Sequence, residues 1–208
     1  MTNGVTNVEL ILASQSPRRK YLLEQAGLRF RVIPSPFDES SVASAEPAAY
    51  VQNLAENKAD DVAVHYPEAW VIGADTIVAA EDRLLGKPAS KEAARRMLGR
   101  LSGKTHQVYT GFCICRHRDN LKFIKAVRTD VTFKDLSENE IEWYIRTGEP
   151  FDKAGAYAIQ GMGTFLVRRI NGSYSNVVGL PVCEVIEILI REGIMDLELK
   201  THHPHIAS

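Results

Sequence analysis

The sequence predicts an α/β protein built on a mixed β-sheet, and two features predict it. In the first half of the 208 residues, short apolar runs typical of buried strands alternate with segments whose apolar residues recur at helical spacing. In the second half, two apolar runs of strand character follow each other directly, as in a hairpin. Strands that alternate with helices are typically parallel, whereas the two strands of a hairpin are antiparallel. We therefore expect parallel and antiparallel strands in one sheet.

The first part of the chain is expected to form a strand, a helix, a second strand and a longer helix. The strands are expected over residues 8–13 and 30–34. Between them Ser16 is a suitable N-cap, Pro17 suits the first helical position, and Gly27 ends the helix. The longer helix is expected over residues 47–64, because its apolar residues share one face: Val51, Leu54, Ala55, Ala59 and Val62.

The rest of the chain is expected to continue this mixture. Strands are expected over residues 70–74, 107–115, 121–133 and 164–170. The second and third of these pair as a hairpin about Asp119-Asn120. Helices are expected to begin at Ser90, to run from the capping box of Ser137 and Glu140 to Gly148, and to cover residues 182–192.

The composition excludes several classes of protein. With 45% hydrophobic and 25% charged residues, the chain is globular rather than disordered. A formal net charge of -1 predicts no nucleic-acid polymer as a partner. No window reaches the roughly 18 apolar residues of a membrane span, so no membrane is expected. Three cysteines make no disulfide framework, and with no secretory signal they favour a cytoplasmic location.

The turn from Ser14 to Arg19 is a candidate anion site. A helix N-terminus carries partial positive charge and favours acidic residues in its first turn, yet here that turn contains Arg18 and Arg19. An anion bound at that end reverses the sign of the effect, since free N–H groups, serine hydroxyls and guanidinium groups together suit a phosphate. The alternative is that both arginines face solvent or pair with surface carboxylates.

Asp75 is the candidate catalytic residue. It is expected to end the strand over 70–74 and therefore to lie at the sheet edge where α/β proteins bind ligands. Its carboxylate suits a hard cation such as Mg²⁺, or a proton taken from water. A purely structural turn carboxylate is the alternative.

Three further charged residues could support these two sites. Lys58 interrupts the apolar face of the helix over 47–64, where it either extends to solvent or turns inward towards a phosphate. Lys87 lies in the constrained turn Gly86-Lys87-Pro88, and Glu39 lies in a polar loop from which it could supply a metal-binding oxygen.

Two apparent nucleotide-binding motifs are excluded by their context. Gly99 to Thr105 resembles a Walker A loop but is one residue short, and it follows a helix instead of a strand. Gly161-Met162-Gly163 is no dinucleotide motif, because a strand rather than a helix is expected after it.

Five motifs in this order resemble the Maf family and cover the chain from about residue 9 to 193. They are Leu12-Ala13-Ser14-x-Ser16-Pro17-Arg18-Arg19, Gly73-Ala74-Asp75-Thr76, Gly86-Lys87-Pro88, Asp152-Lys153-Ala154-Gly155-Ala156-Tyr157 and Asn176-Val177-Val178-Gly179-Leu180-Pro181. The resemblance implies the fold of inosine triphosphate pyrophosphatases (Maf/Ham1), in which an elongated mixed sheet flanked by helices forms a central cleft. It implies a single domain over residues 1–195 with two lobes around that cleft, and a homodimer. Residues 196–208 show no clear apolar period and are expected to form a flexible tail.

The activity that the resemblance implies is hydrolysis of a nucleoside triphosphate to monophosphate and pyrophosphate. Residues 156–161 and 174–179 resemble the branch of the family that acts on dTTP and UTP, whereas the branch acting on 7-methyl-GTP has Glu where Gln160 stands. By the same resemblance Asp75 is the proton acceptor, and Arg18, Thr76 and Gln160 set base specificity. The amide of Gln160 can both donate and accept, which matches the edge of uracil or thymine.

The sequence thus leads to a specific hypothesis for the site. The substrate-binding residues are Ser14, Arg18, Arg19, Lys58, Thr76, Lys87 and Gln160, and Asp75 with Glu39 holds Mg²⁺ or Mn²⁺. Two alternatives stay open. One is a nucleotide-binding regulator without hydrolytic activity, linked to septum formation. The other is a house-cleaning hydrolase for modified pyrimidine nucleotides such as 5-methyl-UTP or pseudo-UTP.

Overall fold

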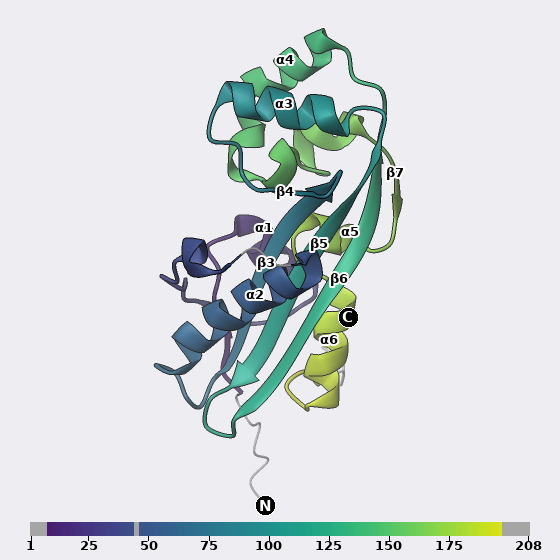
Figure 1. Cartoon of the computed structure of the whole chain (residues 1–208). Helices are drawn as coiled ribbons and strands as arrows, with labels where there is room; N and C mark the ends of the chain where they lie inside the picture. Colours follow the sequence, from purple (N-terminus) through teal and green to yellow (C-terminus); the bar gives the residue numbers. More distant parts are fainter. Residues whose placement is uncertain (1–7, 44–45, 197–208) are drawn as a thin grey trace, which may run out of the picture.

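A computed structural model describes residues 8–43 and 46–196 as a mixed sheet flanked by helices (Figure 1). The described strands form one sheet in the order β2-β1-β3-β5-β6-β7, and β4 also pairs with β3. The strands are β1 (Leu10–Leu12), β2 (Arg31–Val32), β3 (Trp70–Ala80), β4 (Arg83–Leu85), β5 (Thr105–Arg116), β6 (Leu121–Phe133) and β7 (Val167–Asn171). The α-helices are α1 (Pro17–Gln25), α2 (Pro47–Ala63), α3 (Lys91–Leu101), α4 (Glu138–Arg146), α5 (Tyr174–Val178) and α6 (Val182–Arg191).

The long strands β3, β5 and β6 run along the length of the molecule (Figure 1). They are antiparallel to one another, while β1 is parallel to both β2 and β3, so the predicted mixed sheet is confirmed. The predicted hairpin is also confirmed, because β5 and β6 pair from Thr105↔Thr132 to Arg116↔Leu121.

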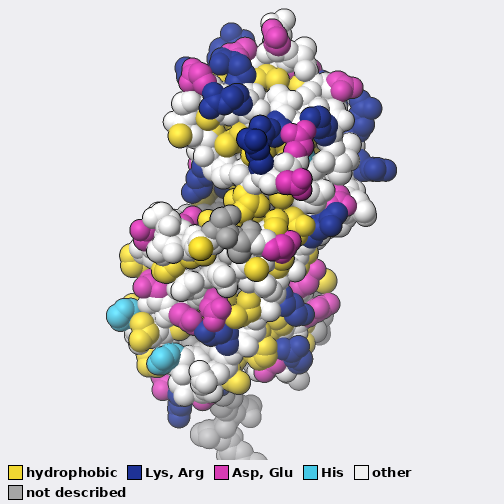
Figure 2. Space-filling model, viewed as in Figure 1, with side chains coloured by type: hydrophobic (Ala, Val, Ile, Leu, Met, Phe, Trp, Pro, Cys, Tyr) yellow, Lys and Arg dark blue, Asp and Glu magenta, His cyan; other side chains and the backbone are white. Residues whose placement is uncertain are grey.

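Three apolar clusters hold the helices against the sheet. In the lower part of Figure 1, α2 covers one face through the predicted stripe that includes Ala55, Ala59 and Val62, while α1 and α6 cover the other face. In the upper part, α3 and α4 pack over the far ends of β3, β5 and β6. The space-filling view in Figure 2 shows the surface narrowing between these two parts. The single domain expected over 1–195 stays a prediction, and of the tail expected over 196–208 only Asp196 is described.

Glycines let α2 lie directly on the sheet. A Cβ atom on Gly73 would stand 2.3 Å from the carbonyl oxygen of Ala55, and one on Gly111 would stand 2.3 Å from that of Val51. Those separations are far inside van der Waals contact, so only glycine permits this approach of helix and strands. As a result Lys58, on the sheet-facing side of α2, lies 9% exposed against the strands.

Two predicted strands differ from the observed ones. The strand expected over 70–74 continues to Ala80, because β5 pairs with β3 from Val71 through Ala79. The strand expected over 164–170 begins only at Val167, and residues Gly161–Leu166 form a 3-10 helix instead. The short elements β4 and α5 were not expected from the sequence. No helix in the described part of the chain is long and apolar enough to span a bilayer.

His106 makes the stability of the upper cluster, the apolar cluster beneath α3 and α4, depend on pH. The side chain is 1% exposed, its Nε2 lies 2.8 Å from the Tyr157 hydroxyl, and burial lowers the pKa of His106 from 6.5 to about 4. Because the unfolded chain takes up this proton at a higher pH than the folded one, the stabilisation is complete above pH 6.5 and is lost as pH falls towards 4. We expect the free energy of unfolding to fall by up to about 3 kcal/mol over that range.

Urea denaturation at several pH values between 4 and 7 would test this effect of His106. We expect the variant His106→Phe to be less stable at neutral pH, because the Tyr157 hydroxyl loses its partner, but its stability should depend less on pH. Equal pH dependence in the variant and the unaltered protein would contradict the assignment.

Candidate active site

A cavity of about 800 Å³ lies beside the middle of β3. On the edge of β3 opposite β5, β1 pairs with Trp70–Ile72 and β4 pairs with Val78–Ala80. Among the described strands, none pairs with the segment between them on that edge. Asp75 lies in this segment, inside the continuous strand Trp70–Ala80 and not at a strand end, which corrects the sequence-based expectation. It still faces a ligand-accessible space, since the strand order changes at this point of the sheet.

Asp75, Lys58 and Glu39 form a linked charge cluster at the base of this cavity. The Lys58 ammonium donates to Asp75 Oδ1 at 2.6 Å and to Glu39 Oε1 at 2.7 Å. The side chains of Lys58 and Asp75 are only 11% and 12% exposed, so Lys58 turns inward rather than extending to solvent. Burial opposes ionisation of Glu39, but the hydrogen bond and charge of Lys58, assisted by Lys87, outweigh it and hold the pKa of Glu39 below its usual value.

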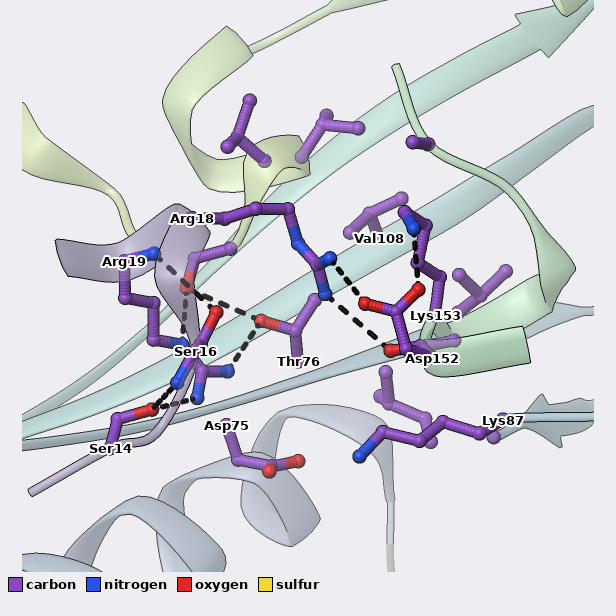
Figure 3. Close-up of a pocket in the computed structure, with 18 of the residues that line it drawn as sticks. Ser14, Ser16, Arg18, Arg19, Asp75, Thr76, Lys87, Val108, Asp152 and Lys153 are labelled. Carbon is purple, nitrogen blue, oxygen red and sulfur yellow. Dashed lines mark hydrogen bonds and ion pairs between the residues drawn. The ribbon is translucent and has the colours of Figure 1, made fainter. Parts of the chain in front are cut away.

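Arg19 is fixed in the first turn of α1 by three acceptors. Its Nε donates to the Gly179 carbonyl at 2.8 Å, Nη1 to Ser14 Oγ at 3.1 Å and Nη2 to Thr76 Oγ1 at 3.2 Å (Figure 3). Burial lowers the pKa of Arg19, and the charge of Asp75 opposes that change, but a guanidinium stays protonated in proteins. The cavity thus has a firmly held, partly buried positive charge close to Asp75.

Asp75 and Thr76 reach different parts of the site because successive residues of a strand point to opposite faces. Asp75 points to the α2 side. The Thr76 hydroxyl lies on the α1 side, where it also shares a hydrogen bond of 2.9 Å with Thr110. Around this strand edge, the cavity lining includes every site residue predicted from the sequence: Ser14, Arg18, Arg19, Glu39, Lys58, Asp75, Thr76, Lys87 and Gln160. Figure 3 shows the Lys87 side chain extending towards Asp75 from the loop after β4.

Sequence reasoning gave no role to two residues that the structure brings to the site. Asp152 Oδ2 accepts from Arg18 Nη1 at 2.9 Å, and Lys153 also lines the cavity. Both belong to a motif quoted for the resemblance to the Maf family. Membership of that motif was the available signal, because 134 positions separate Arg18 from Asp152 and no local pattern links them.

The carboxylates of Asp75 and Glu39 are chemically suitable ligands for a divalent cation. Asp75 and Glu39 come from different elements and converge on one positive charge, and their oxygens are ligands that Mg²⁺ and Mn²⁺ accept. Within residues 8–43 and 46–196, no three or more His, Cys, Asp or Glu side chains are grouped to hold a metal. Water or phosphate oxygens would therefore have to complete the coordination, as is common for Mg²⁺.

The fold and this cavity define an α/β protein whose cavity gathers several cationic side chains around a buried carboxylate. The chain belongs to the Maf-like protein family, whose model matches residues 9–192. A relative from Syntrophus aciditrophicus (strain SB), named dTTP/UTP pyrophosphatase, is 50% identical over 93% of this chain and 95% of its own length. A protein of the same name from Myxococcus xanthus (strain DK1622) is 53% identical over 89% of this chain and 93% of its own length. The fold is that of the Ham1 protein from Staphylococcus aureus, with a TM-score of 0.50 and 15% identity over 88% of this chain and 99% of that one.

Proposed function

We propose that the protein is a nucleoside triphosphate pyrophosphatase that hydrolyses dTTP and UTP to the monophosphate and pyrophosphate. The observation that carries the proposal is the gathering of Arg18, Arg19, Lys58 and Lys87 around Asp75 in one cavity. Its volume of about 800 Å³ suits a nucleotide. The names of the relatives at 50% and 53% identity support the same activity.

The reaction needs positioning and charge neutralisation more than a nucleophilic side chain. The cations bind the triphosphate, and Arg19 needs no rearrangement because the Gly179 carbonyl, Ser14 and Thr76 already hold it. Asp75 accepts a proton from the attacking water while the bond from the α-phosphorus to the bridging oxygen breaks and pyrophosphate leaves. A divalent cation held by Asp75 and Glu39 would supply further neutralisation of phosphate charge when bound.

Base selection is assigned to Arg18, Thr76 and Gln160, which all line the cavity. Gln160 precedes the 3-10 helix Gly161–Leu166, whereas Arg18 lies in α1 and Thr76 in β3. A nucleotide between them would contact three separate elements. Mg²⁺ or Mn²⁺ as the metal, a homodimer and a cytoplasmic location belong to the same proposal.

A substrate panel tests this proposal directly. Pyrophosphate release would be measured with dTTP, UTP, CTP, dCTP, ATP, GTP and 7-methyl-GTP, first with Mg²⁺ and then with EDTA. We expect metal-dependent release from dTTP and UTP, with the monophosphate as the second product. Release from 7-methyl-GTP alone would overturn the base assignment, and nucleotide binding without any release would favour a regulator.

A further inference from the structure

Arg18 is held by a carboxylate from the other side of the cavity. Its Nη1 donates to Asp152 Oδ2 at 2.9 Å and its Nη2 donates to the Asp152 carbonyl oxygen at 3.5 Å. The second carboxylate oxygen of Asp152 accepts from Lys153, whose ammonium also donates to the Glu149 carbonyl at 2.7 Å. Both oxygens of Asp152 are therefore engaged by cations that line the cavity, as Figure 3 shows.

This contact joins the two parts of the molecule across the cavity. Arg18 lies in the first turn of α1, in the lower part, and Asp152 ends the 3-10 helix Glu149–Asp152, in the upper part. Burial opposes ionisation of Asp152, but Lys153 and Arg18 outweigh it and lower the pKa of Asp152 to about 2. Asp152 is therefore negatively charged throughout the neutral range.

The negative charge of Asp152 beside a triphosphate opposes nucleotide binding by repulsion, so another effect of Asp152 must favour binding if the residue is useful to the site. A long arginine side chain on a helix surface loses considerable conformational freedom when it binds a ligand. A carboxylate that already holds its guanidinium removes much of that cost. The Arg18 side chain is 28% exposed and Asp152 is 61% exposed, so the pair contributes little to folding, which leaves orientation as its effect.

We propose that Asp152 is a positioning residue that holds the Arg18 guanidinium in place for the nucleotide, with Lys153 supporting the Asp152 carboxylate. It acts through Arg18 and does not itself contact the substrate. The inference rests on the proposed function, because Arg18 is assigned there to nucleotide binding.

The test is a double-mutant cycle of Arg18→Ala and Asp152→Ala. In Asp152→Ala we expect the KM for dTTP to rise about tenfold while kcat changes less than about threefold. Asp152→Asn keeps one acceptor oxygen for Arg18 and should raise KM only about threefold. In the Arg18→Ala background, removal of Asp152 should change KM less than about twofold, since nothing remains for it to orient.

A matched control is Glu68→Ala. Glu68 accepts from Arg118 at 2.6 Å in an exposed ion pair that does not line the cavity. Its removal should leave KM and kcat unchanged, which separates positioning from the general loss of an ion pair. Thermal unfolding of every variant would verify that the fold is retained.

Three results would overturn the positioning role: an unchanged KM in Asp152→Ala, a lower KM, or an equal rise in KM with and without Arg18. Calorimetric binding of an α,β-imido analogue of dUTP, which cannot release pyrophosphate, repeats the cycle without turnover. Failure of the proposed function is distinct, since it appears as absent pyrophosphate release from the unaltered protein. The calorimetric cycle then still decides the role of Asp152.

Discussion

Replacing Asp75 by Asn is expected to slow pyrophosphate release from dTTP about 10³-fold or more, because an amide cannot take the proton of the attacking water. The fold should survive, since Asn has nearly the same volume and the backbone of residue 75 is held by pairing with Gly111 of β5. Lys58 also keeps its bond of 2.7 Å to Glu39 and can donate to the new amide oxygen. Binding of the α,β-imido analogue should therefore change far less than turnover.

The measurement is single-turnover pyrophosphate release at saturating dTTP, together with thermal unfolding. Asp130→Asn on β6 is the matched control, because Asp130 pairs with Arg128 and lies outside the cavity. It should retain full activity. Turnover of Asp75→Asn within tenfold of the unaltered protein would remove Asp75 from the proton-transfer step.

Local periodicity predicted α2 and its buried face, but not the environment of Lys58. The position of Lys58 among apolar residues left two orientations open. Inward orientation depends on Gly73 and Gly111, which let the helix touch the sheet, and on two carboxylates from elsewhere in the chain. No local pattern contains that information, because it follows from the pairing of β3 with β5.

The same limit explains the misplaced end of β3. An Asp-Thr step after an apolar run is typical of a strand that ends, and only continuous pairing with β5 carries the strand to Ala80. The cavity forms where β1 stops and β4 begins along β3, and β4 is too short to give a periodic signal. The sequence thus predicted which residues meet, through the motifs of a family, but not the strand edge on which they meet.

The short elements after α4 show a different difficulty. Phe165 and Leu166 were assigned to a strand because they are apolar and followed by Val167. In the structure they pack into the upper cluster as part of the 3-10 helix Gly161–Leu166, which begins at a glycine with a φ of +65°. A run of apolar residues this short fits either structure, and the positive φ at Gly161 favours a turn into the helix.

Lys58→Met is expected to lower the free energy of unfolding by about 3–5 kcal/mol, because it removes the cation from the buried pair with Asp75, whose side chain is only 12% exposed. The methionine fills similar space, yet Asp75 and Glu39 then face each other without the ammonium that binds both of them. Lys122 provides the control, since it also bridges two carboxylates, Glu56 at 2.8 Å and Asp60 at 2.7 Å, but on the surface. Lys122→Met should cost about 1 kcal/mol or less and leave turnover unchanged.

The Lys58 variant also tests whether the two carboxylates can hold a metal. A divalent cation must compete with the ammonium in the unaltered protein, whereas in Lys58→Met it can occupy the position between Asp75 and Glu39. Because a ligand that binds the folded state raises its stability, Mn²⁺ should raise the Tm of Lys58→Met more than that of the unaltered protein. Glu39→Gln in the same background should abolish the difference. An equal response to Mn²⁺ in all three proteins would show that the metal binds elsewhere, and a Tm of Lys58→Met equal to that of Lys122→Met would show that the buried cluster is not a source of stability.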